Sequence, residues 1–338
     1  MKKTFRILMT LMAVLLALTA CSAPADTAKN GQTSDTVYKI GVIQYAPHPS
    51  LDNCYTGILA GLEESGLVIG ENLTIDFQNA MGDMANSDLM AKNMAAARYD
   101  MIIGIATPAA MSAYAAAKED GIPVIFCAVS DPVGAGLAES LEKPNTGATG
   151  TKDALNLEGQ LAMIRAFLPK ADTIGILYTV SEPNSVSHLA EFERLAPSYG
   201  FTIESVGINN ASEVATGAAA LVAKGVDCVN NFTDNNVVDN LSTLLHATDG
   251  AGIPVFGSEV TQVTAGCLAS ETLDYVALGR ETGLMAVKVL KGEGNVKTLP
   301  ISVIVDSTPV YNAAVAEKFS IVLPAAYAEA PDVQAVVE

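Results

Sequence analysis

The 338-residue sequence contains no tryptophan and few basic residues, with 19 lysines and arginines against 37 aspartates and glutamates. The resulting formal charge of −18 repels polyphosphate, which argues against a nucleic-acid-binding protein that works by counterion release. Charged residues make up only 17% of the chain and hydrophobic residues 50%, a composition too apolar for a disordered protein. A chain of this length suits roughly two domains, each with its own core.

Sequence motifs that mark common catalytic and metal sites are also missing. There is no GxSxG nucleophile elbow, no HExxH zinc motif and no Walker A loop. Gly134 and Gly136 follow a predicted strand but lack the third glycine of a dinucleotide fingerprint, so they indicate a turn. The histidines, His48, His188 and His246, lie far apart. The sequence therefore predicts binding without chemistry: no enzyme, no catalytic residue, no metal and no cofactor.

The cysteines form no CxxC pair and have no neighbouring histidine, which argues against a zinc site. Two of them lie inside apolar strand patterns, so buried free thiols are the favoured interpretation. A disulfide is the alternative, and spacing alone does not decide between the two. This interpretation covers Cys54, Cys127, Cys228 and Cys267.

The long apolar run of the chain lies at its N-terminus. Lys2, Lys3 and Arg6 precede an apolar segment, residues 7–20, that is too short for a comfortable membrane span. This order of a basic segment and a short apolar one is typical of a signal peptide. We predict that residues 1–20 are removed on export.

The signal segment ends in Leu18-Thr19-Ala20-Cys21, which resembles the bacterial lipobox. We therefore expect Cys21 to be lipidated and to become the mature N-terminus. Residues 21–37 are then the lipidated N-terminus and a flexible tether, because they lack apolar periodicity. Loss of the signal takes away three positive charges and no acid, so the net charge moves from −18 to −21.

From residue 38 onward, short β-branched runs alternate with helical patterns. Tyr55, Ile58, Leu59 and Leu62 recur at helical spacing, and Gly66 follows as a stop signal. Such alternation indicates βαβ units and parallel sheets. We predict strands at 39–44, 73–78, 101–105, 124–128, 173–178, 202–206, 226–230, 255–257 and 301–305.

A short internal repeat divides the chain. The sequence Gly-Ile-Pro-Val-Ile-Phe that begins at Gly121 returns as Gly-Ile-Pro-Val-Phe at Gly252. Each copy follows a helical pattern, which itself follows a strand that ends at Thr107 or Thr233. The peptide alone is common before strands in α/β proteins, but the shared order of elements favours two similar lobes.

In open parallel sheets, ligands bind beyond the carboxyl ends of the strands, where the following helices begin. Thr107 is a candidate N-cap there, with Pro108 at the first helical position, and such a helix start suits a carboxylate. Asn184 and Ser185 occupy the equivalent place in the second half. Asp234 ends another strand and is suited to an ammonium group.

Any one of these polar residues is more often a plain cap or turn than a ligand contact. Their recurrence at one predicted edge of two sheets favours a binding site. The loop after the first strand is either an apolar wall or an ordinary exposed loop, and both interpretations stay open. The predicted ligand-binding residues are Tyr45, Ala106, Thr107, Pro108, Asp131, Asn184, Ser185, Asp234, Asn235 and Glu259.

Together with the lipobox, several segments carry a family resemblance. They are Ile40-Gly-Val-Ile-Gln44, His48-Pro-Ser-Leu-Asp52, Ile105-Ala-Thr-Pro-Ala109, Ser130-Asp-Pro-Val-Gly-Ala-Gly136, Leu141-Glu-Lys-Pro-Asn145, Ile174-Gly-Ile-Leu-Tyr178, Ser181-Glu-Pro-Asn-Ser185, Thr233-Asp-Asn235 and Leu278-Gly279. In these segments the chain resembles the ABC transporter substrate-binding lipoproteins of the tryptophan or aromatic amino-acid-binding type, over roughly residues 38–304.

The resemblance implies an α/β fold of the type I periplasmic-binding-protein class, with two Rossmann-like lobes, parallel sheets and three hinge crossings. By analogy, residues 38–150 plus 272–298 form the N-terminal lobe, and residues 151–271 plus 299–328 form the C-terminal lobe. Residues 329–338 are left as a C-terminal tail.

The resemblance also implies roles for individual residues. The α-carboxylate of an amino acid would be held by Thr107 and Ser185, and its α-ammonium by Asp234 and Glu259. The implied protein is a monomeric receptor, lipid-anchored to the outer face of the cell membrane or periplasmic, that binds no nucleic acid. It delivers a small zwitterion, expected to be an aromatic amino acid, to an ABC permease and ATPase.

Two alternatives stay open beside this hypothesis. The same fold could bind a nucleoside, a sugar or another small metabolite, although the absence of tryptophan counts mildly against a sugar. An exported α/β enzyme is the less favoured alternative.

Overall fold

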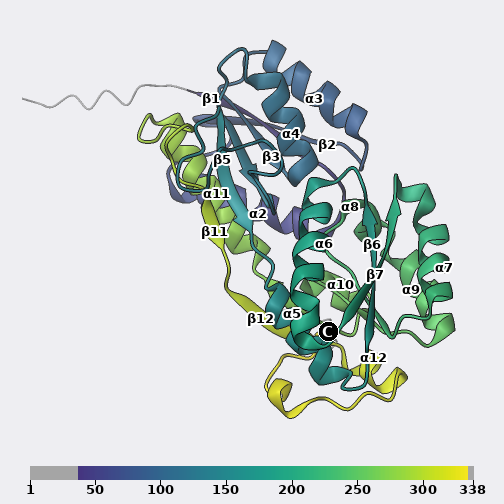
Figure 1. Cartoon of the computed structure of the whole chain (residues 1–338). Coiled ribbons are helices and arrows are strands. Elements are labelled where there is room, and N and C mark those ends of the chain that lie inside the picture. The colour runs from purple at the N-terminus through teal and green to yellow at the C-terminus, as the bar shows by residue number, and fades with distance from the viewer. Residues whose placement is uncertain (1–36, 334–338) are drawn as a thin grey trace, which may run out of the picture. The chain divides into compact units, whose positions relative to one another are not determined.

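Two parallel sheets organise residues 37–333, the part of the chain that this computed structural model describes (Figure 1). The predicted signal peptide, Cys21 and nearly all of the tether lie outside the described residues. The first sheet has six parallel strands in the order β11-β5-β4-β3-β1-β2. Its strands are β1 (Tyr38–Gln44), β2 (Leu73–Asn79), β3 (Met101–Ile105), β4 (Val124–Cys127), β5 (Ala148–Asp153) and β11 (Ser302–Ile304).

The second sheet has four parallel strands in the order β7-β6-β8-β9. They are β6 (Thr173–Thr179), β7 (Thr202–Ile208), β8 (Cys228–Asn230) and β9 (Val255–Phe256). An antiparallel pair, β10 (Ala269–Leu273) with β12 (Ser307–Tyr311), completes the strands of the described residues.

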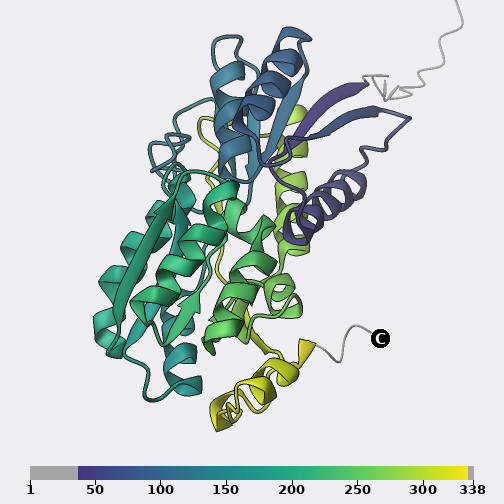
Figure 2. The ribbon, with the colours of Figure 1, turned by 90° about the vertical axis from the view of Figure 1, so that its right-hand side faces the viewer.

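Helices cover both faces of each sheet, as in doubly wound α/β proteins. Figure 2 shows α2 and α11 on one side of the first sheet and α3 with α4 on the other. The helices of this half are α2 (Pro49–Glu64), α3 (Met84–Ala96), α4 (Thr107–Ala117) and α11 (Tyr275–Leu290). Those of the second half are α5 (Leu157–Phe167), α6 (Pro183–Leu195), α7 (Val214–Lys224), α8 (Asn235–Asp239), α9 (Leu241–Ala251), α10 (Val260–Thr264) and α12 (Ala313–Lys318).

Helices α2 and α11 approach each other closely because glycines line their contact. A Cβ added at Gly57 would lie 2.1 Å from the Val276 carbonyl oxygen, and one at Gly279 would lie 2.1 Å from the Cys54 carbonyl oxygen. No larger residue fits at these positions without moving a backbone. The contact ties α11, which comes late in the sequence, to the first half of the chain.

The chain passes between the two halves three times, so the expected three crossings are present. They lie at residues 154–156 after β5, at Asp274 before α11, and at residues 305–306 between β11 and β12. By sheet membership, β5 up to Asp153 and all of β11 belong to the first lobe, whereas the predicted boundaries assigned residues 151–153 and 299–305 to the second. β5 carries no apolar run that would have marked it, and the sequence does not show which sheet the predicted strand at 301–305 joins.

All nine predicted strands appear in the structure, although that at 226–230 begins two residues later, at Cys228. The sequence reading missed β5, β10 and β12, whose sequences ATGTKD, ASETL and STPVY are rich in small and polar residues. These strands gain their stability from burial between neighbours rather than from local propensity.

The four described cysteines are buried free thiols, as predicted. Among residues 37–333, no helix combines the length and apolar character needed to cross a bilayer.

Candidate functional site

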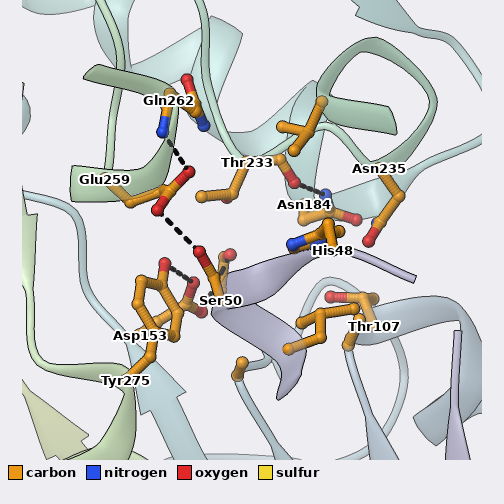
Figure 3. A pocket seen from close by; sticks show the side chains of 15 residues that line it. His48, Ser50, Thr107, Asp153, Asn184, Thr233, Asn235, Glu259, Gln262 and Tyr275 are labelled. Atoms are coloured by element: carbon orange, nitrogen blue, oxygen red, sulfur yellow. Dashed lines mark hydrogen bonds between the residues drawn. The ribbon is translucent and has the colours of Figure 1, made fainter. Parts of the chain in front are cut away.

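A small cavity lies where the carboxyl ends of the two sheets meet (Figure 3). Its lining comes from both lobes: His48, Ser50, Leu51, Ala106, Thr107, Ala128, Ser130, Asp153, Asn184, Thr233, Asn235, Val238, Glu259, Gln262 and Tyr275.

Helix starts supply most of this lining, because each follows a strand that ends at the cavity. His48, Ala106 and Glu259 are the N-caps of α2, α4 and α10, while Asn235 and Tyr275 are the first residues of α8 and α11. The first turn of a helix carries N–H groups without intrahelical partners and the positive end of the helix dipole.

The start of α4 differs from the expected cap. Thr107 was predicted as the N-cap, but the structure places Ala106 there, with φ 76° and ψ 155° and no side-chain cap, and Thr107 is the first helical residue. The backbone arrives in a conformation that alanine rarely adopts, and such strain costs of the order of 1–3 kcal/mol and clusters at functional sites. The first turn of α4 therefore faces the cavity without a capping acceptor.

Four side chains of the lining have a buried polar atom without a hydrogen-bond partner. These atoms are Nδ1 of His48, Oγ1 of Thr107, Oδ1 of Asn184 and Oγ1 of Thr233. Burial lowers the pKa of His48 below its ordinary value, so its ring is neutral near pH 7. A buried polar group left unpaired costs about 1–3 kcal/mol, so the cavity is built for a ligand with polar groups of its own.

Two carboxylates also line the cavity, whereas its 15 described lining residues include no lysine or arginine. Asp153 is 3% exposed and accepts hydrogen bonds from the Ser130 hydroxyl at 3.0 Å and the Tyr275 hydroxyl at 3.3 Å. Burial raises the pKa of the Asp153 carboxyl to about 6. Glu259 is 1% exposed and caps α10, where its oxygens accept from the backbone N–H groups of Thr261 and Gln262.

The acidic groups and the unpaired polar groups lie on different sides of the cavity. Figure 3 shows Asp153 and Glu259 on one side and Thr107, Asn184 and Asn235 on the other. The arrangement separates negative charge from groups able to hold an anion, which suits a ligand that is itself dipolar.

Hydrogen bonds also join the two lobes around the cavity. The Ser50 hydroxyl donates to Oε2 of Glu259 at 2.6 Å, and the Ser187 hydroxyl donates to Oδ2 of Asp131 at 3.0 Å. One partner of each bond follows a strand of the first sheet, and the other follows a strand of the second. The first bond lies in the cavity lining, and the second lies in an outer groove.

Five of the ten predicted ligand-binding residues line the cavity: Ala106, Thr107, Asn184, Asn235 and Glu259. Two others lie nearby without lining it. Tyr45 is 5% exposed and its hydroxyl donates to the Gly82 carbonyl, and Pro108 is the second residue of α4.

The remaining three are used in internal contacts. The Ser185 hydroxyl donates to Oδ2 of Asp234 at 2.7 Å, and Asp234 is fully buried outside the cavity lining. Asp131 accepts from Ser187 across the lobes and lines an outer groove instead. Ser185, predicted to bind the ligand carboxylate, and Asp234, predicted to bind its ammonium, are thus hydrogen-bonded to each other.

Sequence reasoning missed much of the first-lobe side of the cavity, including Ser50, Leu51, Ala128, Asp153 and Tyr275. Asp153 ends β5, a strand without an apolar run, and Tyr275 begins a helix that returns from the second lobe. Ala128 is the last residue of the strand predicted at 124–128, and Ser50 lies in the loop after the first predicted strand, so a place at a strand end was the available signal for both. Among the described residues, no group of three histidine, cysteine or acidic side chains is placed to hold a metal ion.

Known proteins resemble this chain over most of its length. The family model described as ABC transporter substrate binding protein matches residues 39–333. A tyrosine-binding protein of Clostridioides difficile is 34% identical over 319 residues, which cover 92% of this chain and 91% of that protein.

Solved structures agree with this match. An ABC domain from Streptococcus pneumoniae in complex with L-Trp superposes with a TM-score of 0.84 at 35% identity, covering 87% of this chain and 98% of that one. The ligand-free, open structure of a substrate-binding protein with adhesive properties from Clostridium difficile superposes with a TM-score of 0.65 at 37% identity, covering 86% of this chain and 97% of that one. A myo-inositol-bound transporter protein from Bacillus halodurans, 15% identical with a TM-score of 0.61 and 85% and 99% covered, shares the fold alone.

Proposed function

Because the chain belongs to the family of ABC transporter substrate-binding proteins, we propose that its cavity captures a free amino acid with an aromatic side chain. The observation that carries this proposal is the separation of charge in the cavity. An α-amino acid presents a carboxylate and an ammonium on one carbon, and the cavity offers donors on one side and carboxylates on the other.

The ligand carboxylate is assigned to the start of α4. This helix has 11 residues, no side-chain cap and a Thr107 hydroxyl that is buried without a partner. Helix N-termini bind anions through their free N–H groups and their dipole, and a carboxylate there would also satisfy Thr107. Asn184, in the first turn of α6, faces the same space from the other lobe.

An aromatic side chain is supported by the relatives and by the apolar part of the lining. The relatives named above are a tyrosine-binding protein and an L-Trp complex. Leu51, Ala128 and Val238 give this cavity apolar surface beside its polar groups. Such a mixture of apolar walls and a few placed polar groups is typical of small-molecule sites.

Binding between two lobes implies a receptor that opens and closes. Ligand bound to both lobes stabilises the closed form by its differential affinity for that form. The bonds from Ser50 to Glu259 and from Ser187 to Asp131 add to the closed state. In this proposal the closed form is the one that delivers the ligand to the transporter, and the protein performs no reaction and uses no cofactor.

The proposal also includes location and partners. The protein is a monomer, exported and held at the outer face of the cell membrane by lipid on Cys21, where it serves an ABC permease and ATPase. A Cys21→Ser variant would then move from the membrane fraction to the soluble fraction of cells, with ligand binding unchanged. Retention of that variant in the membrane fraction would contradict the anchor and leave the ligand assignment intact.

Ligand binding is tested with residues 22–338 purified without lipid. Isothermal titration with each standard amino acid should give the tightest binding for an aromatic one, and Thr107→Val should weaken it by about tenfold, the value of one hydrogen bond to a charged group. Thr56→Val, an exposed threonine on α2, is the matched control and should leave affinity unchanged. The proposal fails if no amino acid binds and native mass spectrometry of the purified protein finds a nucleoside, a sugar or no small molecule.

A further inference from the structure

The two carboxylates that line the cavity, Asp153 and Glu259, and Asp234, the carboxylate that the sequence predicted for the ammonium, differ in how far the protein already satisfies them. A carboxylate has about four acceptor positions on its two oxygens. A buried carboxylate also needs a compensating positive charge or several donors, because its desolvation is otherwise costly. The group with the fewest internal partners is therefore the one best placed to receive a cation from a ligand.

Asp234 is already fully supplied with donors. Its oxygens accept from the Thr179 backbone at 2.6 Å, the Thr179 hydroxyl at 2.8 Å, the Ser185 hydroxyl at 2.7 Å and the Val237 backbone at 3.0 Å. It is 0% exposed and does not line the cavity. It holds α8 against β6, and a ligand has no access to it.

Glu259 lines the cavity but is also well supplied with donors. Oε1 accepts from the Gln262 backbone at 2.9 Å, and Oε2 accepts from the Thr261 backbone at 2.8 Å and from the Ser50 hydroxyl at 2.6 Å. The Thr261 hydroxyl adds a further donor at 2.6 Å. Its charge is therefore spread over a helix start and two hydroxyls.

Asp153 has fewer donors than either, and all of them are neutral: the Ser130 and Tyr275 hydroxyls, one for each oxygen, and its own backbone N–H. The Lys152 ammonium, whose charge influences Asp153, donates to the Ser130 carbonyl rather than to Asp153. Asp153 is 3% exposed and lines the cavity. It is a nearly buried carboxylate with acceptor positions to spare and no hydrogen-bonded cation, facing a space without lysine or arginine.

From this comparison we infer that Asp153 receives the ammonium group of the ligand. The inference rests on the proposed function and deepens it, since it names the ligand group and its partner. It replaces Asp234, which sequence reasoning assigned to the ammonium, and it makes Glu259 chiefly a cap and a contact between the lobes.

The position of Asp153 also connects ligand capture to closure. Asp153 is the last residue of β5, directly before the crossing at residues 154–156. Its partner Tyr275 is the first residue of α11, directly after the crossing at Asp274. An ammonium bound to Asp153 therefore acts at two of the three crossings, where small backbone rotations change the angle between lobes.

A pH dependence of affinity follows. Burial, the largest cause, raises the pKa of Asp153 to about 6, while the Ser130 hydroxyl, the backbone N–H of Asp153, the charge of Lys152 and the Tyr275 hydroxyl lower it. The other titratable groups around it are Glu259 at α10 and Cys54 on α2, which, like Asp153, influence Tyr275. An ammonium favours the ionised carboxylate, so below about pH 6 a proton competes with the ligand, and affinity falls by up to tenfold per pH unit.

The test is a thermodynamic cycle that removes the ammonium from the ligand and the charge from the protein. L-Phenylalanine and 3-phenylpropionate, which lacks the ammonium, are titrated into the wild type, Asp153→Asn and Glu259→Gln near pH 7.5. Asp153→Asn should weaken the binding of L-phenylalanine by about 10–100-fold, as expected for a charged hydrogen bond. It should change the affinity for 3-phenylpropionate by less than about threefold. Glu259→Gln should lower the affinity for both ligands by a similar factor.

Other outcomes overturn the inference. If Glu259→Gln is the variant that loses affinity for L-phenylalanine alone, Asp153 does not hold the ammonium. The same follows if Asp153→Asn lowers the affinity for both ligands equally. The proposed function stands in either case. If the wild type binds no amino acid, the proposed function itself fails.

Tyr275→Phe provides a second variant that keeps the carboxylate, in case Asp153→Asn does not fold. It removes a donor that lowers the pKa of Asp153, so the loss of L-phenylalanine affinity in acid should begin at a higher pH than in the wild type. If the affinity of this variant for L-phenylalanine begins to fall at the same pH as that of the wild type, the inference is also overturned.

Discussion

The hydroxyl of Ser50 donates a 2.6 Å hydrogen bond to Oε2 of Glu259, although the two residues lie 209 positions apart. Ser50 is in the first turn of α2 in the first lobe, and Glu259 caps α10 in the second. Both are buried, with exposed fractions of 2% and 1%. This bond can form only while the lobes are together, so it stabilises the closed form and not the open one.

Ser50→Ala should therefore shift the protein toward the open form. Loss of a hydrogen bond to a charged group costs about 1.5–3 kcal/mol, and the part of this that differs between open and closed states weakens ligand binding by about tenfold. Titration calorimetry measures the affinity, and small-angle scattering measures the radius of gyration without ligand, which should increase. Thr264→Ala, an exposed threonine of α10, is the control. Equal affinities for Ser50→Ala and wild type would show that the bond does not favour closure.

The glycines between α2 and α11 predict a contrast between two substitutions of the same kind. A Cβ at Gly57 would meet the Val276 carbonyl oxygen at 2.1 Å, whereas one at Gly250, within α9, would meet nothing within 4 Å. Gly57→Ala should lower the free energy of unfolding by about 1–3 kcal/mol, because backbone must move. Gly250→Ala should raise it by about 0.5–1 kcal/mol, since alanine is the better helix former. Urea denaturation checks both, and a neutral Gly57→Ala would contradict the close packing of the helices.

The regular part of the fold was predictable from sequence because its strands carry β-branched runs and its helices carry apolar periodicity. The strand at 39–44 and the helix through Tyr55 and Leu62 are examples. In contrast, β5, β10 and β12 form where tertiary neighbours bury small and polar residues, and no local pattern records those neighbours. Two of the three crossings follow such strands, β5 and β10, so their places could not be read accurately from the sequence.

The binding site was predictable in part for a related reason. Thr107, Asn184 and Glu259 directly follow strands with clear patterns, so the rule that ligands bind at strand ends located them. Asp153 was missed because its strand was missed. Asp234 was chosen for its charge, but whether a carboxylate is free or already bonded depends on groups such as Thr179 and Ser185, which lie 55 and 49 residues away.

The cysteines give a prediction about chemical reactivity. Cys54, Cys127, Cys228 and Cys267 are buried free thiols, and burial raises the pKa of Cys54, Cys228 and Cys267. Because the thiolate is the reactive form, a disulfide reagent should label none of the four in the folded protein and all four in denaturant. Thiol titration of residues 22–338 measures this. Thr56→Cys, at an exposed position, should add one fast-reacting thiol; slow labelling there, or fast labelling of the native cysteines, would contradict the burial.

A last prediction concerns Glu182, the N-cap of α6, which is 2% exposed beside Asp234. Burial, and then the charge of Asp234, raises the pKa of the Glu182 carboxyl well above its ordinary value. The native state therefore holds a proton that the unfolded chain releases near pH 4.5. The stability that this proton represents is complete below that pH and is lost as pH rises toward the folded pKa, by up to about 1.4 kcal/mol per pH unit.

Glu182→Gln keeps the shape of the side chain and removes the titration. Its free energy of unfolding should decline less than that of the wild type between about pH 5 and pH 7.5, and the variant should be the more stable protein at the upper end. Urea denaturation across this range measures the slope. Glu193→Gln, an exposed glutamate on the same helix, should follow the wild-type slope. Parallel slopes for Glu182→Gln and wild type would mean that Glu182 is already ionised in the native protein, held by the amide donors of Asn184 and Asn235.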